Sequence, residues 1–94
     1  MTTEVVQDAS QNRFQLLLDG EYVGETDYIL RDDTIVFTHT EIDPNRQEKG
    51  LGAELVRGAL NLVRAETDLR VVAKCPFTAA FIEKNVEYQD LLTR

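Results

Sequence analysis

Gly50 and Gly52 stand one residue apart, directly before an apolar pattern with helical spacing. The first N–H groups of a helix have no partner within the helix, and they lie at the positive end of the helix dipole. An anion such as a phosphate can bind there by backbone alone, and glycines leave it room to approach. The pattern lacks the third glycine of a dinucleotide fingerprint and the Gly-Lys-Ser/Thr ending of a nucleotide-triphosphate loop. An ordinary helix start containing glycines is therefore the alternative interpretation.

His39 and Glu41 form a second pair of chemically capable residues, at the end of a β-branched and aromatic stretch. A histidine exchanges its proton near neutral pH, and either side chain can act as a general base directly or through water. Strand alternation places both on one face with Ile35 and Phe37. The alternative is that both are ordinary polar residues with hydrogen-bond partners at a strand end.

Cys75 is the only cysteine, and it directly precedes Pro76, a residue favoured at the first position of a helix. A thiol at a helix N-terminus can have a lowered pKa and act as a nucleophile or as a polarising group. A small buried side chain with no chemical role is the alternative. A single cysteine excludes a disulfide within the chain, and we therefore expect a reducing, cytoplasmic location.

Length and charge limit the classes of function. We expect 94 residues to form one domain, residues 1–94, with an ordinary hydrophobic fraction of 43%. The net charge of −7 argues against nucleic acid as a partner, because such binding needs clustered Lys and Arg. No apolar run reaches the length of a membrane span. Arg46, Lys49 and Arg57 make the surroundings of the two glycines a mildly basic exception.

Periodicity predicts a small mixed α/β sheet covered by helices, in the order β-β-β-α-β-α. The expected strands are residues 13–18, 21–30, 34–42 and 69–75, and the expected helices are about 50–66 and 76–85. Because a helix joins the last two strands, we expect those two to run parallel.

Three segments resemble the GNAT N-acetyltransferase superfamily, and most closely a group of very small GNAT-like proteins, and they follow one another along the chain in the family's order. Gln47-Glu48-Lys49-Gly50-Leu51-Gly52 is similar to the superfamily's Q/R-x-x-G-x-G/A loop. His39-Thr40-Glu41-Ile42 and Cys75-Pro76-Phe77 are similar to the H-T-E-V and C-P-F motifs of the small group. The similarity extends from about Ile35 to Leu92.

The resemblance implies an acetyl-coenzyme A donor and an amine acceptor, with no metal. It implies that the cofactor's pyrophosphate is bound by the glycine loop and the helix start, which are Gln47, Glu48, Lys49, Gly50, Leu51, Gly52 and Ala53. It also implies that backbone N–H groups around Glu41, Ile42 and Asp43 bind the thioester carbonyl and the pantetheine arm, with Cys75 near the acetyl group. His39 and Glu41 lie in the region where relatives often carry a base.

Two departures from the superfamily pattern affect these expectations. Glu48 replaces a glycine, and we expect its carboxylate to point into solvent and to oppose the cofactor slightly. Ile82 replaces the tyrosine that many relatives use as general acid. A coenzyme-binding sensor without turnover is therefore the first alternative function, and an interaction module without a ligand is the second. The acceptor and the oligomeric state do not follow from the sequence.

Overall fold

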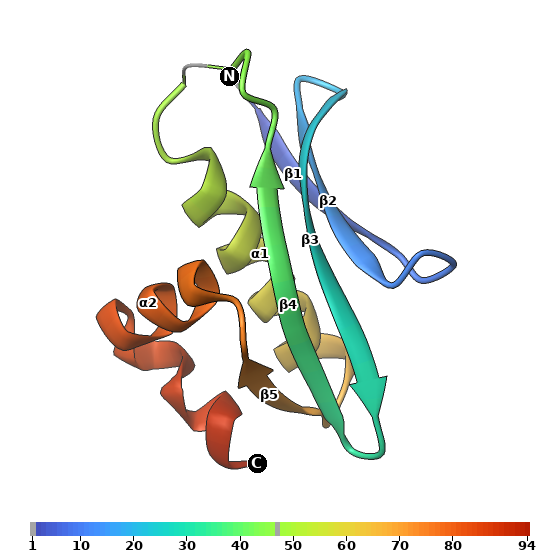
Figure 1. Cartoon of the computed structure of the whole chain (residues 1–94), viewed down its shortest axis with the longest axis vertical. Coiled ribbons are helices and arrows are strands. Elements are labelled where there is room, and N and C mark those ends of the chain that lie inside the picture. The colour runs from blue at the N-terminus through green and yellow to red at the C-terminus, as the bar shows by residue number, and fades with distance from the viewer. Residues whose placement is uncertain (1, 47) are drawn as a thin grey trace.

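A single five-stranded sheet carries both helices on one of its faces (Figure 1). The structure is a computed structural model that describes residues 2–46 and 48–94. Its strands lie side by side in chain order, β1-β2-β3-β4-β5. The elements are β1 (Thr3–Asp8), β2 (Arg13–Leu18), β3 (Glu21–Arg31), β4 (Thr34–Ile42), α1 (Leu51–Glu66), β5 (Arg70–Ala73), α2 (Pro76–Lys84) and a 3₁₀ segment, η1 (Val86–Thr93).

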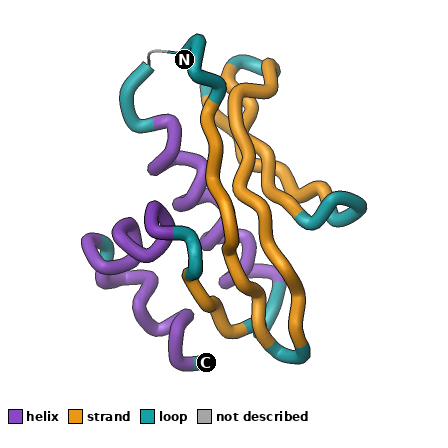
Figure 2. The backbone as a smooth tube through the Cα atoms, in the orientation of Figure 1, coloured by secondary structure: helices purple, strands orange, loops and turns teal. Residues whose placement is uncertain are grey.

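The first four strands form an antiparallel meander, and β5 joins β4 in parallel (Figure 2). The parallel pair follows from the chain path, since α1 must return the chain to the end of the sheet where β4 began. The expected mixed α/β class and the expected parallel pair are confirmed. Tight turns at Asp19-Gly20 and Asp32 connect the meander, with positive φ angles at all three residues.

β1 is a strand that the sequence analysis did not predict. Its sequence, TEVVQD, is short and half polar, so it has no clear alternation to mark it. It becomes a strand because it pairs with β2 and packs against the middle of α1, where Gly58 faces Val5. A Cβ at Gly58 would lie 2.6 Å from the Val5 Cβ, so the glycine is what allows this close approach.

The core lies between α1, α2, η1 and the helix-facing side of the sheet. α1 buries one stripe at helical spacing, as its apolar periodicity predicts. The sheet contributes three aromatic rings, Phe14, Tyr28 and Phe37, whose centroids lie 5.3 to 6.3 Å apart. No helix in the described ranges covers the opposite face of the sheet, on which Ile29, Thr38 and His39 are exposed (Figure 1).

A β-bulge in β4 reverses the side-chain alternation in the middle of the strand. Tyr28 pairs with Phe37, but the preceding residue of β3, Asp27, pairs with His39, so Thr38 is an extra residue. Phe37 is 1% exposed in the core, whereas the His39 and Glu41 side chains are 58% and 69% exposed. The expectation that His39 and Glu41 share a face with Phe37 is therefore wrong.

Within the described ranges, neither α1 nor α2 is both long enough and apolar enough to span a lipid bilayer.

Candidate functional site

The site is built around a gap that opens between β4 and β5. Their pairing ends at Phe37 and Ala73, where the N–H groups of Lys74 and Cys75 both donate to the Phe37 carbonyl, at 3.0 and 2.9 Å. The chain then turns into α2, while β4 continues to Ile42 paired only with β3. The far half of β4 thus has one edge without a neighbouring strand.

Backbone N–H groups of β4 point into this gap. The Asp43 N–H donates to Val23 on the β3 side, at 2.8 Å. Because successive residues of an antiparallel strand turn their N–H groups to opposite edges, those of Thr40 and Ile42 point away from β3. These two groups are donors aimed at the gap, and a cofactor-binding role for Ile42 stays a prediction.

The N-terminus of α1 has free N–H groups beside this end of β4. Gly50 precedes the helix with φ of 81°, a left-handed conformation that favours glycine, and among the described residues no side chain caps the helix. The first helical hydrogen bond runs from the Glu54 N–H to the Gly50 carbonyl, at 2.9 Å. The N–H groups of Leu51, Gly52 and Ala53 therefore have no intrahelical partner. Gln47 lies outside the described residues.

Gly52 has a packing role in addition to its place in the loop. A Cβ built on Gly52 would lie 2.8 Å from the tip of the Phe77 ring at the start of α2. The two helix N-termini approach each other because this position has no side chain. At Gly50, by contrast, a Cβ would meet nothing within 4 Å, so the backbone conformation is what requires glycine there.

Glu48 does not point freely into solvent, contrary to expectation. Its Oε2 lies 3.5 Å from Nη1 of Arg46, and its side chain is 31% exposed. Oε1 is buried with no hydrogen-bond partner among the described residues. Arg46 also pairs with Glu21 at the β2–β3 turn, so both acidic groups share one guanidinium. The charge of Arg46 is thus neutralised by Glu21 and Glu48, whereas the side chain of Lys49, the other basic residue of the loop, is exposed.

Cys75 lies on the helix side of the gap, at the N-cap position of α2. Its thiol donates to the Thr40 hydroxyl at 3.5 Å, and Thr40 Oγ1 lies 2.9 Å from Thr26 Oγ1. The Thr26 hydroxyl can donate in turn to the His39 carbonyl, at 3.1 Å. The chain of hydroxyls can also be reversed, so that Thr40 donates to a thiolate and Thr26 donates to Thr40. Both protonation states of the sulfur therefore find a partner.

The pKa of the Cys75 thiol lies below its ordinary value. Burial raises this pKa, since Cys75 is only 5% exposed and a thiolate is poorly solvated there. The hydrogen bond with the Thr40 hydroxyl and the polar groups of Phe77 and Thr78 at the start of α2 together lower the pKa by more. A thiolate at Cys75 is thus easier to form than in a free cysteine.

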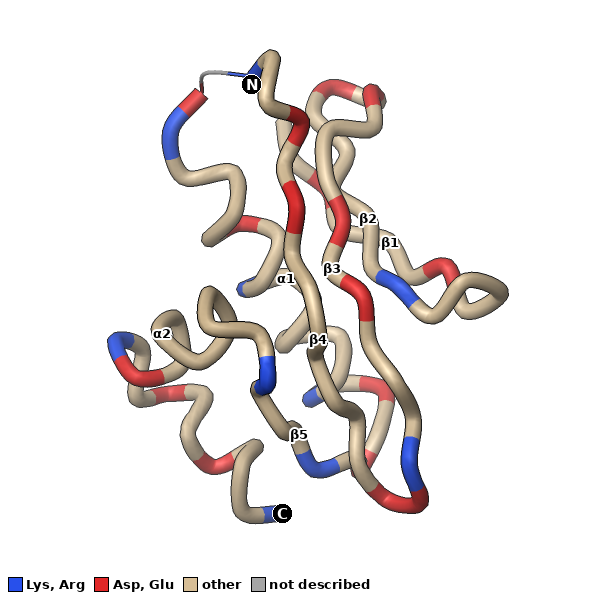
Figure 3. Tube along the Cα trace, in the orientation of Figure 1, with Lys and Arg blue, Asp and Glu red and all other residues tan. Residues whose placement is uncertain are grey.

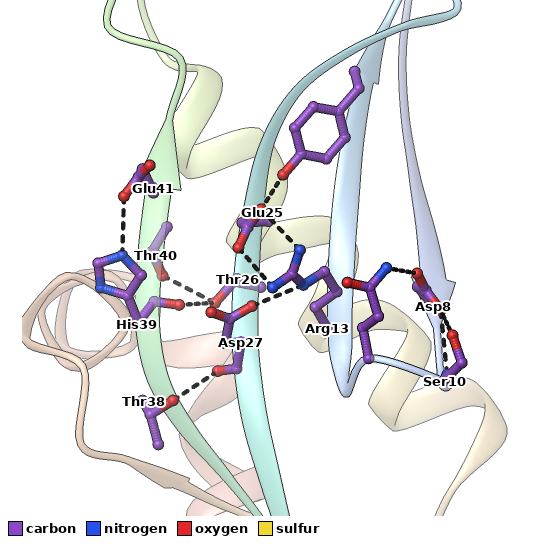
Figure 4. A network of polar contacts seen from close by, with 12 residues as sticks. Asp8, Ser10, Arg13, Glu25, Thr26, Asp27, Thr38, His39, Thr40 and Glu41 are labelled. Atoms are coloured by element: carbon purple, nitrogen blue, oxygen red, sulfur yellow. Dashed lines mark hydrogen bonds and ion pairs between the residues drawn. The ribbon is translucent and has the colours of Figure 1, made fainter.

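His39 and Glu41 lie on the open face of the sheet, on the other side of β4 from Cys75. His39 Nε2 is 3.2 Å from Glu41 Oε1 (Figure 4). Next to them on β3, Asp27 and Glu25 both contact Arg13 at 3.1 Å. The structure therefore does not bring His39 and Glu41 into contact with Cys75: the three residues flank the gap from its two sides.

Comparison with protein families gives one match that spans most of the chain. Residues 13–91 match the family described as GCN5-related N-acetyl-transferase. The chain belongs to this family. No curated protein sequence matches it. The matched region includes β2 to β5 and both helices, but leaves out β1.

In this GCN5-related N-acetyltransferase, none of the three tyrosines stands at the position expected for the general acid. Ile82, at the expected tyrosine position, is 2% exposed and packs in the core. The three tyrosines bond elsewhere: Tyr22 to Glu25, Tyr28 to Gln7 and Tyr88 to Asn61. Cys75 is a titratable side chain on the helix side of the gap.

Thr40 and Thr26 lie beside Cys75 at the gap, and sequence reasoning missed them. Thr40 stands in the H-T-E-I segment between His39 and Glu41, whose side chains are the more obvious candidates for proton transfer. Its inward orientation depends on the bulge at Thr38, which simple strand alternation does not reveal. No group of three His, Cys, Asp or Glu side chains in the described ranges has the arrangement of a metal site.

Proposed function

We propose that this acetyltransferase domain binds acetyl-coenzyme A and transfers its acetyl group to an amine. The single observation that carries the proposal is the meeting of two sets of free N–H groups: those at the start of α1 and those of β4 at the gap. The first set suits the pyrophosphate, and the second suits the carbonyl of the thioester. Lys49 adds a positive charge to the loop.

The cofactor's placement follows from these donors. The pyrophosphate binds at Leu51, Gly52 and Ala53, with Gly50, Lys49, Glu48 and Gln47 forming the preceding loop. The pantetheine arm enters the gap along β4, where the N–H groups of Thr40 and Ile42 receive its polar atoms. The acetyl group then lies between the two strands, near Cys75.

The transfer step needs a base and an acid on opposite sides of the thioester. The amine nitrogen attacks the carbonyl carbon, a C–N bond forms, and the C–S bond breaks. His39, supported by Glu41, takes the proton of the amine on the open face, directly or through water. Cys75 gives its proton to the departing coenzyme A thiolate on the helix side. β4 separates His39 from Cys75, as the reaction requires, because the amine approaches the thioester from one side and the thiolate leaves on the other.

A coenzyme-binding sensor without turnover is the second candidate. The buried Ile82 favours the sensor, because it cannot donate a proton as the usual tyrosine does, and the three tyrosines of the chain bond elsewhere. In this function the same α1 loop binds acetyl-coenzyme A, but no amine consumes the thioester. The two candidates share the cofactor site and differ only in the chemistry at the gap.

Isothermal titration with acetyl-coenzyme A tests the cofactor site. Gly50→Ala places a side chain on a backbone with φ of 81°, and Gly20→Ala does the same in the β2–β3 turn, where φ is 84°. Neither Cβ would meet another atom within 4 Å, so the two variants carry matched strain. We expect Gly50→Ala to weaken binding about tenfold or more, as loss of charge-assisted hydrogen bonds does, and Gly20→Ala to leave binding unchanged. Equal affinities in both variants would reject the site.

Thiol release from acetyl-coenzyme A in the presence of mixed amines tests turnover. If Cys75 supplies a proton, Cys75→Ala slows release without affecting cofactor affinity. If Cys75 instead accepts the acetyl group, mass spectrometry of the wild-type protein will show an acetylated Cys75, and Cys75→Ser will abolish it. Tight binding with no thiol release from any amine would favour the sensor.

A further inference from the structure

A basic groove lies on the open face of the sheet, across β3, β4 and β5. Its apolar floor is formed by Ile29, Val36 and Val72, and its volume is about 230 Å³. Val36 is only 8% exposed although it points away from the helices, because the surrounding longer side chains cover it. The polar lining consists of Thr34, Thr38, Arg31, Arg70 and Lys74.

The charge of this groove is opposite to that of the chain. The protein carries a net charge of −7, yet three cations and no acidic side chain line the groove. Figure 3 marks basic positions along β5 and at the end of β3. Among residues 2–46 and 48–94, Arg31, Arg70 and Lys74 have no ion-pair partner. The nearby acidic turn, Asp32-Asp33, lies beyond the end of the groove. A concave site of one charge sign concentrates ligands of the other sign.

The groove leads directly to the gap between β4 and β5. Thr38 and Lys74, at one end of its lining, flank the point where the two strands separate. His39, the proposed base, follows Thr38 on the same face. Arg70, at the start of β5, lies four residues before Lys74, which directly follows the strand, a distance of about 13 Å along an extended chain. A ligand held at Arg70 must therefore be elongated to reach the gap.

We propose that this groove binds the acetyl acceptor, and that the acceptor is an elongated amine with an apolar middle and a carboxylate about 10 Å from the nitrogen. The proposal rests on the proposed acetyl-transfer function. The carboxylate binds between Arg31 and Arg70, the apolar part covers Val36 and Val72, and the amine lies beside Thr38. At that end, the positive charge of Lys74 favours the neutral form of the amine, which is the form that attacks a thioester.

ω-Aminooctanoate is a suitable probe, because its extended chain has this length and these end groups. Its amide, ω-aminooctanamide, keeps the length and the amine but lacks the negative charge. We expect ω-aminooctanoate to shift the backbone NMR signals of Val36, Val72 and Lys74 in the protein without acetyl-coenzyme A. The amide should bind at least about tenfold more weakly, because it loses the charge-assisted hydrogen bonds.

Matched charge variants locate the contact. Arg70→Gln removes one cation of the groove, whereas Lys84→Gln removes one cation from α2, on the helix side of the sheet. We expect Arg70→Gln to weaken ω-aminooctanoate binding about tenfold and Lys84→Gln to leave it unchanged. In the presence of acetyl-coenzyme A, the wild type should acetylate ω-aminooctanoate faster than its amide.

Each contrary result has a defined meaning. Equal binding of the acid and the amide, or no response at the three groove signals, overturns the proposal. Groove signals that move on dilution of the protein alone would assign the face to a second copy of this chain, which also overturns it. If other amines are acetylated but ω-aminooctanoate in the groove is not, the acceptor assignment fails. If no amine releases the thiol while the probe still binds, the acetyl-transfer function fails and the groove remains an anion-binding site.

Discussion

The Cys75 sulfur lies 3.5 Å from the Thr40 hydroxyl oxygen, and this contact joins the start of α2 to β4 across the gap. Thr40 is directed inward only because Thr38 forms a bulge two residues before it. The same bulge turns His39 and Glu41 outward. One extra residue thus determines that the thiol has a hydroxyl partner and that the possible bases lie on the opposite face.

Thr40→Val should raise the pKa of the Cys75 thiol. Valine has nearly the shape of threonine but cannot hydrogen-bond to sulfur, so the contribution that lowers the pKa is lost while burial remains. The ultraviolet absorbance of the thiolate, followed as a function of pH, measures the change. Thr38→Val is the control, because its hydroxyl bonds to the Asp27 carbonyl on the open face. An unchanged thiol titration in Thr40→Val would show that Thr40 does not influence the sulfur.

Glu48→Gln should strengthen binding of coenzyme A. The substitution removes a negative charge beside the α1 N-terminus and leaves Arg46 with Glu21 as its remaining partner. The gain should be at most about 1 kcal/mol, or about fivefold in affinity, as for a charge near a helix end. Glu66→Gln, at the other end of α1, is the control for the change in net charge. Weaker binding in Glu48→Gln would mean that Glu48 organises the loop through Arg46.

Asp27→Asn should stabilise the protein at neutral pH. Burial raises the pKa of Asp27, and the negative charge of Glu25 adds to this, against the attraction of Arg13. Because the folded-state pKa is raised, the ionised carboxylate disfavours folding above that pKa. Below the unfolded-state pKa the group is neutral in both states. The stabilisation should therefore shrink as the pH falls through the acidic range, and thermal unfolding at several pH values measures it.

Asp8→Asn is a control of opposite sign for the Asp27 experiment. Hydrogen bonds from the Ser10 and Gln11 side chains lower the pKa of Asp8. Its carboxylate therefore stabilises the fold above its unfolded-state pKa, and this contribution is lost as the pH falls. Asp8→Asn should lower the unfolding temperature at neutral pH, with a difference that also fades in acid. The same sign of change in both variants would contradict the assignment of the two shifts.

Gly58→Ala should destabilise the protein by displacing β1 from α1. Alanine normally favours a helix interior by about 1 kcal/mol over glycine. Here the new Cβ would lie 2.3 Å from Val5 Cγ2, and relieving such an overlap costs about 1–3 kcal/mol. Urea unfolding measures the balance. Val5→Ala removes the obstructing methyl groups, so Gly58→Ala in that background should be less destabilising or even stabilising. An equal cost in both backgrounds would show that Val5 is not the obstacle.

The elements with strong local signals could be predicted from the sequence. Apolar spacing of 3.6 residues marks α1, the Asp19-Gly20 turn marks the β2–β3 hairpin, and Pro76 marks the start of α2. The glycine loop and the C-P-F segment also led to the acetyltransferase family that the family match shows. These features are local, so a short stretch of chain contains the whole signal.

β1 and the direction of the β4 side chains could not be predicted in this way. TEVVQD becomes a strand because β2 offers it an edge and Gly58, which is distant in sequence, offers it a contact surface. The bulge at Thr38 depends on how β3 and β4 pair. The one extra residue moves every later side chain of β4 to the opposite face of the sheet.

The sequence by itself determined which chemical groups this protein has near its glycine loop: a thiol, an imidazole, a carboxylate and a helix start without a capping side chain. Only the tertiary structure decided how they are divided, with Cys75 and Thr40 on the helix side of the gap and His39 and Glu41 on the open face. It also gathered Arg31, Arg70 and Lys74, which no sequence pattern connects, around one groove. The physical reason is that residue types are local, whereas strand register and the parallel pairing of β4 with β5 arise from contacts between distant parts of the chain.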